Sequence, residues 1–161
     1  MTWSSGSAAS GTGVIGPAGE GVVHAALTAA APYGYRLFNP AAGQTGMILG
    51  TVLRGPLDNG GILTTIDQRT HTPNGQYVVA VEVKNTRSWI YQGAVELYQL
   101  LDKAAVLQRE HPDHDFLPVL VCRRAHPMVN HLAEQLGFYV ISTKRQYVPA
   151  NLPQRELGED G

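Results

Sequence analysis

Three residues whose side chains could do metal and phosphate chemistry lie close together in the sequence: Asp67, Glu82 and Lys84. Asp67 and Glu82 each end a run of apolar and β-branched residues typical of a strand, and a turn signal at residues 73–75 separates the runs. Because side chains alternate between the faces of a strand, Glu82 and Lys84 point the same way. If the two strands pair, Asp67 can lie beside Glu82 at one end of a sheet. Two carboxylates and one ammonium there predict a site for a divalent metal ion and a phosphate.

The composition is typical of one soluble globular domain. The chain has 161 residues, of which 43% are hydrophobic, so it is long enough to bury a sizeable core. No apolar stretch approaches the roughly 20 residues that span a bilayer, and residues 1–6 lack the basic and apolar segments of a secretory signal. The only cysteine, Cys122, lies in an apolar run and cannot form an internal disulfide. We therefore expect a cytoplasmic protein without a membrane partner.

The distribution of charge bears on nucleic-acid binding. The net charge of −1 argues against a nonspecific coat protein, which would be strongly basic. Basic pairs at 123–124 and 144–145 follow predicted strands, where they could flank a groove or serve as solvated charges that aid solubility. Trp89 and Tyr91 could stack on a base or, more simply, brace the next helix. The candidate nucleic-acid contacts are Lys84, Arg87, Arg123, Arg124, Lys144 and Arg145.

Periodicity divides the chain into alternating helices and strands. Residues 1–18 are rich in Ser, Gly and Ala and predict a flexible leader, 19–148 form the domain, and 149–161 form a loose polar tail. Glycine-rich segments at 55–61 and 73–75 predict turns. The expected elements are a helix at 19–30, an extended piece at 36–38, strands at 47–53, 62–67 and 77–84, a helix at 95–107, a strand at 116–122, a helix at 126–136 and a strand at 138–142.

An Asp on one strand and Glu-x-Lys at the end of the next, in the order α-β-β-β-α-β-α-β, resembles the PD-(D/E)xK nuclease superfamily. The resemblance spans residues 19–141 and implies the restriction-endonuclease-like α/β fold, a mixed β-sheet flanked by helices. Glu20 on the early helix, the Gly-Tyr pair at 34–35 and the segment 82–85 look like features of archaeal Holliday-junction resolvases. Ile66 stands where the founding motif has a proline.

The resemblance implies metal-dependent hydrolysis of phosphodiester bonds, with DNA as the first expected substrate and RNA as the alternative. Asp67 and Glu82, with the backbone carbonyl of Val83, would hold Mg²⁺ or Mn²⁺. Lys84 would orient the attacking water and stabilise the transition state. Glu20 could hold a second metal ion or a metal-bound water, although an acidic residue in the first turn of a helix is also favoured by the helix dipole alone.

Cleavage of both strands of a duplex would suit a homodimer, because each active site cuts one strand. The chain could equally serve as the nuclease subunit of a larger assembly, and structure-selective cutting would fit either arrangement. The alternative is a non-catalytic nucleic-acid-binding or scaffolding protein that retains the nuclease fold. The presence of Asp67, Glu82 and Lys84 together favours the enzyme.

Overall fold

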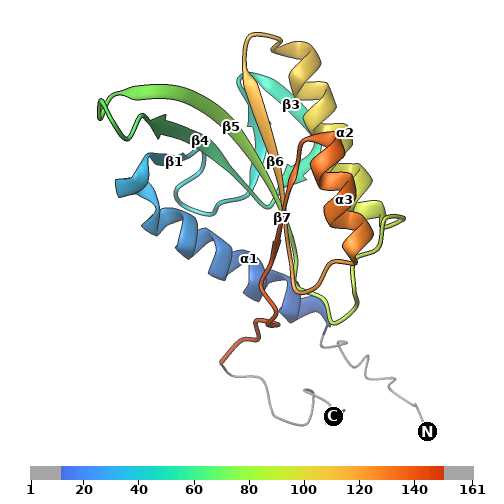
Figure 1. Ribbon diagram of the computed structural model, residues 1–161. Helices are drawn as coiled ribbons and strands as arrows, with labels where there is room; N and C mark the ends of the chain where they lie inside the picture. Colours follow the sequence, from blue (N-terminus) through green and yellow to red (C-terminus); the bar gives the residue numbers. More distant parts are fainter. Residues whose placement is uncertain (1–11, 151–161) are drawn as a thin grey trace, which may run out of the picture.

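A five-stranded mixed sheet forms the centre of the structure, a computed structural model that describes residues 12–150 (Figure 1). The strand order is β1-β4-β5-β6-β7; β1, β4 and β5 pair antiparallel, whereas β5, β6 and β7 pair parallel. Strands β2 and β3 form a separate antiparallel pair. The elements are α1 (Thr12–Ala29), η1 (Ala31–Tyr33), β1 (Tyr35–Leu37), β2 (Thr45–Ile48), β3 (Thr51–Leu57), β4 (Asn59–Ile66), β5 (Pro73–Lys84), α2 (Val95–Glu110), β6 (Asp115–Cys122), α3 (Pro127–Leu136) and β7 (Tyr139–Ser142).

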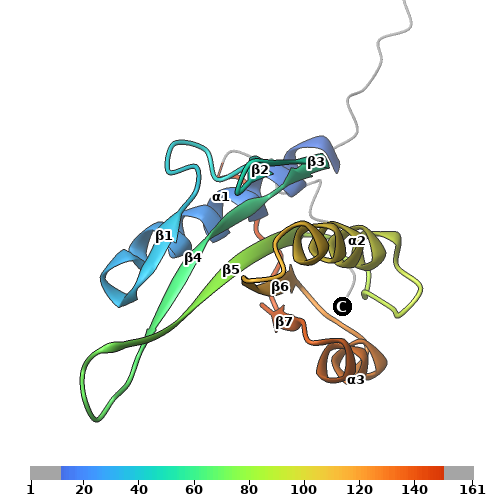
Figure 2. The same cartoon turned by 90° about the horizontal axis from the view of Figure 1, so that it is seen from above.

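Helices cover both faces of the sheet, α1 on one face and α2 and α3 on the other (Figure 2). Consecutive residues of β5 accordingly join two different apolar clusters: Val78 and Ala80 pack toward α2 and α3, whereas Val79 and Val81 pack toward α1. A strand buried on both faces reads as a continuous apolar run, as β5 and β6 do. The predicted α/β class, a mixed sheet flanked by helices, is confirmed.

The buried residues of α2 follow the helical period from which the sequence predicts this helix. Leu97, Leu100, Ala104 and Leu107 are its buried residues, and their spacing places them on one stripe of a 3.6-residue helix. The next helix, α3, ends at Gly137, whose φ of 75° suits the left-handed position after a helix. Both helices therefore begin and end close to the predicted residues.

The first helix begins earlier than predicted. It starts at Thr12, so residues 12–18 are helical, and only 1–11 of the expected leader and 151–161 of the expected tail lie outside the described residues. Tertiary contacts override the weak helix preference of this segment. The amide of Asn85 donates to the carbonyl oxygen of Ile15 at 2.6 Å, and Gly19 lies directly against the Asn85 side chain. These contacts attach the N-terminal half of α1 to the end of β5.

Two further predicted elements differ. The expected strand at 47–53 is two strands, because Leu49 and Gly50 both have positive φ and form the tight turn between β2 and β3. The expected turn at 55–61 is mostly strand. Gly61 belongs to β4, where a Cβ atom would lie 2.7 Å from Cζ of Tyr35, so glycine there permits close packing. The chain bends only at Asp58, between β3 and β4.

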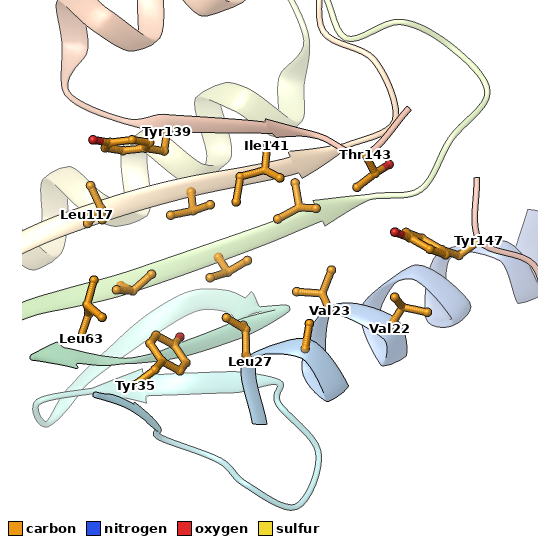
Figure 3. A pocket seen from close by; sticks show the side chains of 15 residues that line it. Val22, Val23, Leu27, Tyr35, Leu63, Leu117, Tyr139, Ile141, Thr143 and Tyr147 are labelled. Carbon is orange, nitrogen blue, oxygen red and sulfur yellow. The ribbon is translucent and has the colours of Figure 1, made fainter. Parts of the chain in front are cut away.

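An apolar groove of about 410 Å³ lies between α1 and the sheet (Figure 3). Its walls include Val22 and Leu27 from α1 and Tyr139 and Ile141 from β7. The lining residues carry no carboxylate, imidazole or amine, and their polar side-chain groups are the hydroxyls of three tyrosines and Thr143. In the part of the chain that the structure describes, no helix is long and apolar enough to cross a membrane.

Candidate active site

Glu82 is a buried carboxylate near the C-terminal end of the central strand β5. Its exposed fraction is 6%, and it lies on the face of the sheet that α2 covers, as Val78 and Ala80 do. Lys84 Nζ lies 3.6 Å from Glu82 Oε1, so the predicted arrangement of Glu82 and Lys84 on one face is confirmed. A buried carboxylate is stable only with partners, and a single ammonium leaves its other oxygen to be satisfied.

The second carboxylate beside Glu82 belongs to Asp58. Asn59 pairs with Val81 in the β4–β5 ladder, so the preceding residue, Asp58, lies level with Glu82. Asp58 Oδ2 accepts a hydrogen bond from the backbone N–H of Val83 at 2.6 Å, which fixes the carboxylate at the end of the sheet. The sequence analysis missed Asp58 because it assigned this segment to a turn.

Asp67 lies at the opposite end of the hairpin, and its predicted place beside Glu82 is wrong. The β4–β5 turn comprises residues 67–72 and not 73–75, since Ile66 pairs with Pro73 (Figure 1). Asp67 is half-buried, and its Oδ1 accepts the backbone N–H groups of Arg69 and Thr70 at 2.8 and 2.9 Å. These backbone hydrogen bonds, that of Thr70 first, lower the pKa of the Asp67 carboxyl. The strand between Pro73 and Glu82 spans about 30 Å, so the two carboxylates cannot share a metal ion.

Lys103 of α2 is a second ammonium at the site, which the sequence analysis did not identify. Its Nζ lies 3.6 Å from Glu82 Oε2 and donates a hydrogen bond to the carbonyl oxygen of Pro56 at 2.9 Å. The side chain is 13% exposed. Lys103 follows Leu100 by three positions and precedes Leu107 by four, so it stands on the buried stripe of α2. A charged residue on an apolar stripe was the signal in the sequence.

Glu20 of α1 approaches the same end of the sheet. Gly19 contacts Asn85, and Asn85 also bonds the backbone of Tyr147, so α1 is held against the residue that follows Lys84. Burial, followed by the charge of Asp58, raises the pKa of the Glu20 carboxyl, and Lys84 opposes the shift. The structure thus places Glu20 near Asp58 and Lys84, while Asp58 takes the place beside Glu82 that was predicted for Asp67.

The charge of Asp58 acts on both glutamate carboxyls of this partly buried site. Burial and then the charge of Asp58 raise the pKa of the Glu82 carboxyl, although Lys103 and Lys84 lower it. Burial also raises the pKa of the Asp58 carboxyl, against the hydrogen bond from Val83 and the two lysines. With all groups ionised, three carboxylates face two ammoniums, which leaves one negative charge. Such clusters of shifted carboxylates are typical of functional sites.

The donor set at this site fits a hard divalent cation. Glu82 Oε2 is buried, and its ion-pair partner Lys103 lies at 3.6 Å, beyond ordinary hydrogen-bond distance, so this oxygen can still accept a closer ligand. No group of three or more His, Cys, Asp or Glu side chains that could share a metal ion occurs within residues 12–150. Zinc sites require such groups, whereas Mg²⁺ is commonly held by one or two carboxylates with water completing its octahedron. Asp58 and Glu82 match the second pattern.

The predicted basic residues gather at the same edge of the sheet. Lys84 pairs with Cys122, and Cys122 pairs with Ser142, so the three parallel strands end level with one another. One basic pair follows β6 directly and the other follows β7 after Thr143, and the backbone N–H of Lys144 donates to the carbonyl oxygen of Arg123 at 3.0 Å. Arg87 Nε donates to Gln146 Oε1 at 3.3 Å. The site is therefore bordered by positive charge.

No protein-family model matches the chain, and no curated protein matches its sequence. Among solved structures, a repair endonuclease from Pyrococcus abyssi shares 16% identity, with a TM-score of 0.45 over 73% of this chain and 44% of that chain. The EndoMS–dsDNA2 complex shares 16% identity, with a TM-score of 0.49 over 94% of this chain and 51% of that chain. EndoMS in its apo form shares 15% identity, with a TM-score of 0.42 over 76% of this chain and 45% of that chain. The chain thus spans about half the length of these structures, and at this level of similarity its own residues must define the chemistry.

Proposed function

We propose that this chain is a metal-dependent nuclease that hydrolyses phosphodiester bonds of DNA. The observation that carries the proposal is the pairing of Asp58 with the buried Glu82 at a strand end, where Lys84 and Lys103 each lie 3.6 Å from one oxygen of Glu82. Phosphodiester hydrolysis needs a cation to neutralise the phosphate, acceptors that hold the cation, and a positioned donor near the attacking water. The site offers each protein component.

Asp58 and Glu82 would hold one divalent cation, Mg²⁺ or Mn²⁺. The cation, when bound, supplies charge neutralisation and a nucleophile at neutral pH. Val83 would add its carbonyl oxygen, because N–H and C=O of one residue point to the same side of a strand and the Val83 N–H already bonds Asp58. Lys84 would orient the attacking water, and Glu20 would accept a proton or hold a water from the side of α1.

Lys103 would act on Glu82 rather than on the substrate. Its bond to the Pro56 carbonyl fixes the ammonium, which in turn fixes Glu82 Oε2 on the face of the sheet toward α2. A carboxylate held in place by a neighbour needs no reorientation when the cation and phosphate arrive. Lys103 is therefore a positioning residue of the proposed site.

The proposed substrate is DNA, and the basic residues that follow β6 and β7 would contact its backbone. Positive charge at this edge would offset the near-neutral balance of the whole chain. A homodimer would present two such sites, one for each strand.

The test is cleavage of a labelled panel of linear duplex, single-stranded and branched DNA together with RNA. Each substrate is incubated with Mg²⁺, Mn²⁺ or EDTA, beside the Lys84→Ala variant. We expect cutting of DNA that requires the metal ion and is lost in Lys84→Ala, and the preferred DNA would define the substrate class. Cutting in EDTA, or equal cutting by Lys84→Ala, would contradict the proposed chemistry.

A further inference from the structure

Trp89 and Tyr91 are exposed aromatic residues on a segment that the fold holds in place. The exposed fractions are 43% for Trp89 and 53% for Tyr91, whereas Ile90 between them is buried. Ile90 forms a parallel bridge with Ala125: its N–H donates to the Arg124 carbonyl at 2.9 Å, and its carbonyl accepts from His126 N–H at 2.8 Å. Ile90 therefore packs into the apolar core, and the two aromatic side chains beside it in the sequence remain partly exposed to solvent.

Each ring has a cationic or aromatic neighbour. The guanidinium carbon of Arg124 lies 5.7 Å from the centre of the Trp89 ring, a cation–π distance. The rings of Tyr91 and His126 lie with their centres 5.4 Å apart. Aromatic rings combined with arginine are the groups on which unpaired bases stack while a cation contacts the adjacent phosphate.

The aromatic pair lies close to the candidate active site. Cys122 pairs with Lys84, and the Ile90–Ala125 bridge follows three residues later on the same strand direction. Three residues reach at most about 10 Å along the chain, so the bridge lies within that distance of the Cα atom of Cys122.

We propose that Trp89 and Tyr91, with Arg124, form a stacking platform for unpaired bases of the DNA strand beside the bond to be cut. This inference rests on the proposed nuclease function and adds its substrate class: single-stranded, frayed or branched DNA rather than a fully paired duplex. Stacking tolerates any base, because every base has a π face, so the platform selects unpaired structure and not sequence.

The test uses the fluorescence of Trp89 itself. Trp3 and Trp89 are the two tryptophans of the chain, so the Trp3→Phe variant reports on Trp89 alone. It is titrated in EDTA with a short oligothymidylate and with a blunt duplex whose ends are G·C base pairs. We expect the oligothymidylate to quench the emission and the blunt duplex to leave it nearly unchanged. The anisotropy of a labelled oligonucleotide shows separately whether the oligothymidylate is bound. Unchanged Trp89 emission with the oligothymidylate bound would overturn the proposal, and this test needs no substitution in the platform residues.

Matched variants then measure the contribution to binding. Trp89→Leu should bind the oligothymidylate about tenfold more weakly, and Trp89→Phe should recover most of the affinity, because a phenyl ring still stacks. Tyr33→Leu is the control: Tyr33 is 82% exposed and precedes β1, on the side of the sheet away from β6 and β7. Equal losses in Trp89→Leu and Tyr33→Leu would overturn the platform.

Cleavage separates this inference from the proposed function. With unpaired DNA as substrate, Trp89→Leu should raise KM while leaving kcat within about twofold, because stacking acts on binding rather than on the reacting atoms. Quenching of Trp89 without any metal-dependent cleavage would refute the nuclease and leave the platform standing. Cleavage that Lys84→Ala abolishes, with kcat/KM for unpaired DNA unchanged in Trp89→Leu, would refute the platform alone.

Discussion

Because Asp58, and not Asp67, lies beside Glu82, substitutions of the two aspartates should affect cleavage differently. Asp58→Asn should abolish most metal-dependent cleavage, whereas Asp67→Asn should cut at the wild-type rate. Both substitutions remove one negative charge and keep the side-chain shape, so they form a matched pair. Their effects should differ because Asp58 lies beside Glu82, and Asp67 serves only the β4–β5 turn.

The structure sets the magnitude of the Asp58 effect. Asparagine retains an oxygen that can accept the Val83 N–H, so Asp58→Asn should cost about 1 kcal/mol of stability or less. Alanine would leave that N–H without an acceptor and should cost about 1–3 kcal/mol. The rate should fall by about 100-fold or more in Asp58→Asn, because one positioned charge is lost from the site. A large loss of rate with a small loss of stability is the expected signature.

Single-turnover cleavage of the preferred DNA in Mg²⁺ measures the rate, and urea unfolding measures stability in parallel. In Asp67→Asn, the amide oxygen can still accept the N–H groups of Arg69 and Thr70, so the turn should persist. Equal rates for wild type and Asp58→Asn would refute the site described above. A loss of cleavage in a folded Asp67→Asn variant would do so as well.

Three further substitutions test the electrostatics of the site. Glu82→Gln should increase the free energy of unfolding near neutral pH. The pKa of Glu82 is raised in the folded state, so ionisation of the carboxyl costs stability as the pH rises above its ordinary value of 4.5. In urea unfolding, the gain from Glu82→Gln should therefore vanish below that pH. Lys103→Met should cost about 3 kcal/mol near neutral pH, because it removes one of two cations from a buried carboxylate, and the cost should shrink in acid as Glu82 is protonated; a pH-independent cost would contradict this. Glu20→Gln should slow cleavage less than Asp58→Asn, and an unchanged rate would restrict Glu20 to a structural role in α1.

The local pattern predicted most elements but not how two of them pair. Apolar periodicity located β5, β6, α2 and α3, because their buried residues follow the period of each element. The register of the β4–β5 hairpin depends instead on which residues between the two strands form the turn. A turn centred on Asn74 would place Ile66 opposite Glu82, with Asp67 next to it. The observed turn at 67–72 places Asp58 there.

The physical reasons for that choice are visible in particular residues. Asp67 binds two backbone N–H groups of the turn with its carboxylate, a local interaction that stabilises this turn over the alternative. Pro73 has no N–H to donate and stands at the first position of β5, where a strand tolerates proline. Gly61 suggested a turn in the sequence, yet its missing side chain makes room for Tyr35. Lys103 was missed because its position on the apolar stripe of α2 gains meaning only once α2 is known to cover Glu82.

Metal binding in solution tests the central claim most directly. Isothermal titration of the protein with Mn²⁺ in the absence of DNA should show a binding site in the wild type and in Asp67→Asn. The same titration should show that site lost or greatly weakened in Asp58→Asn and Glu82→Gln, both of which keep their shape but lose a charged ligand. Undiminished Mn²⁺ binding by folded Asp58→Asn and Glu82→Gln would contradict a metal site formed by these two carboxylates.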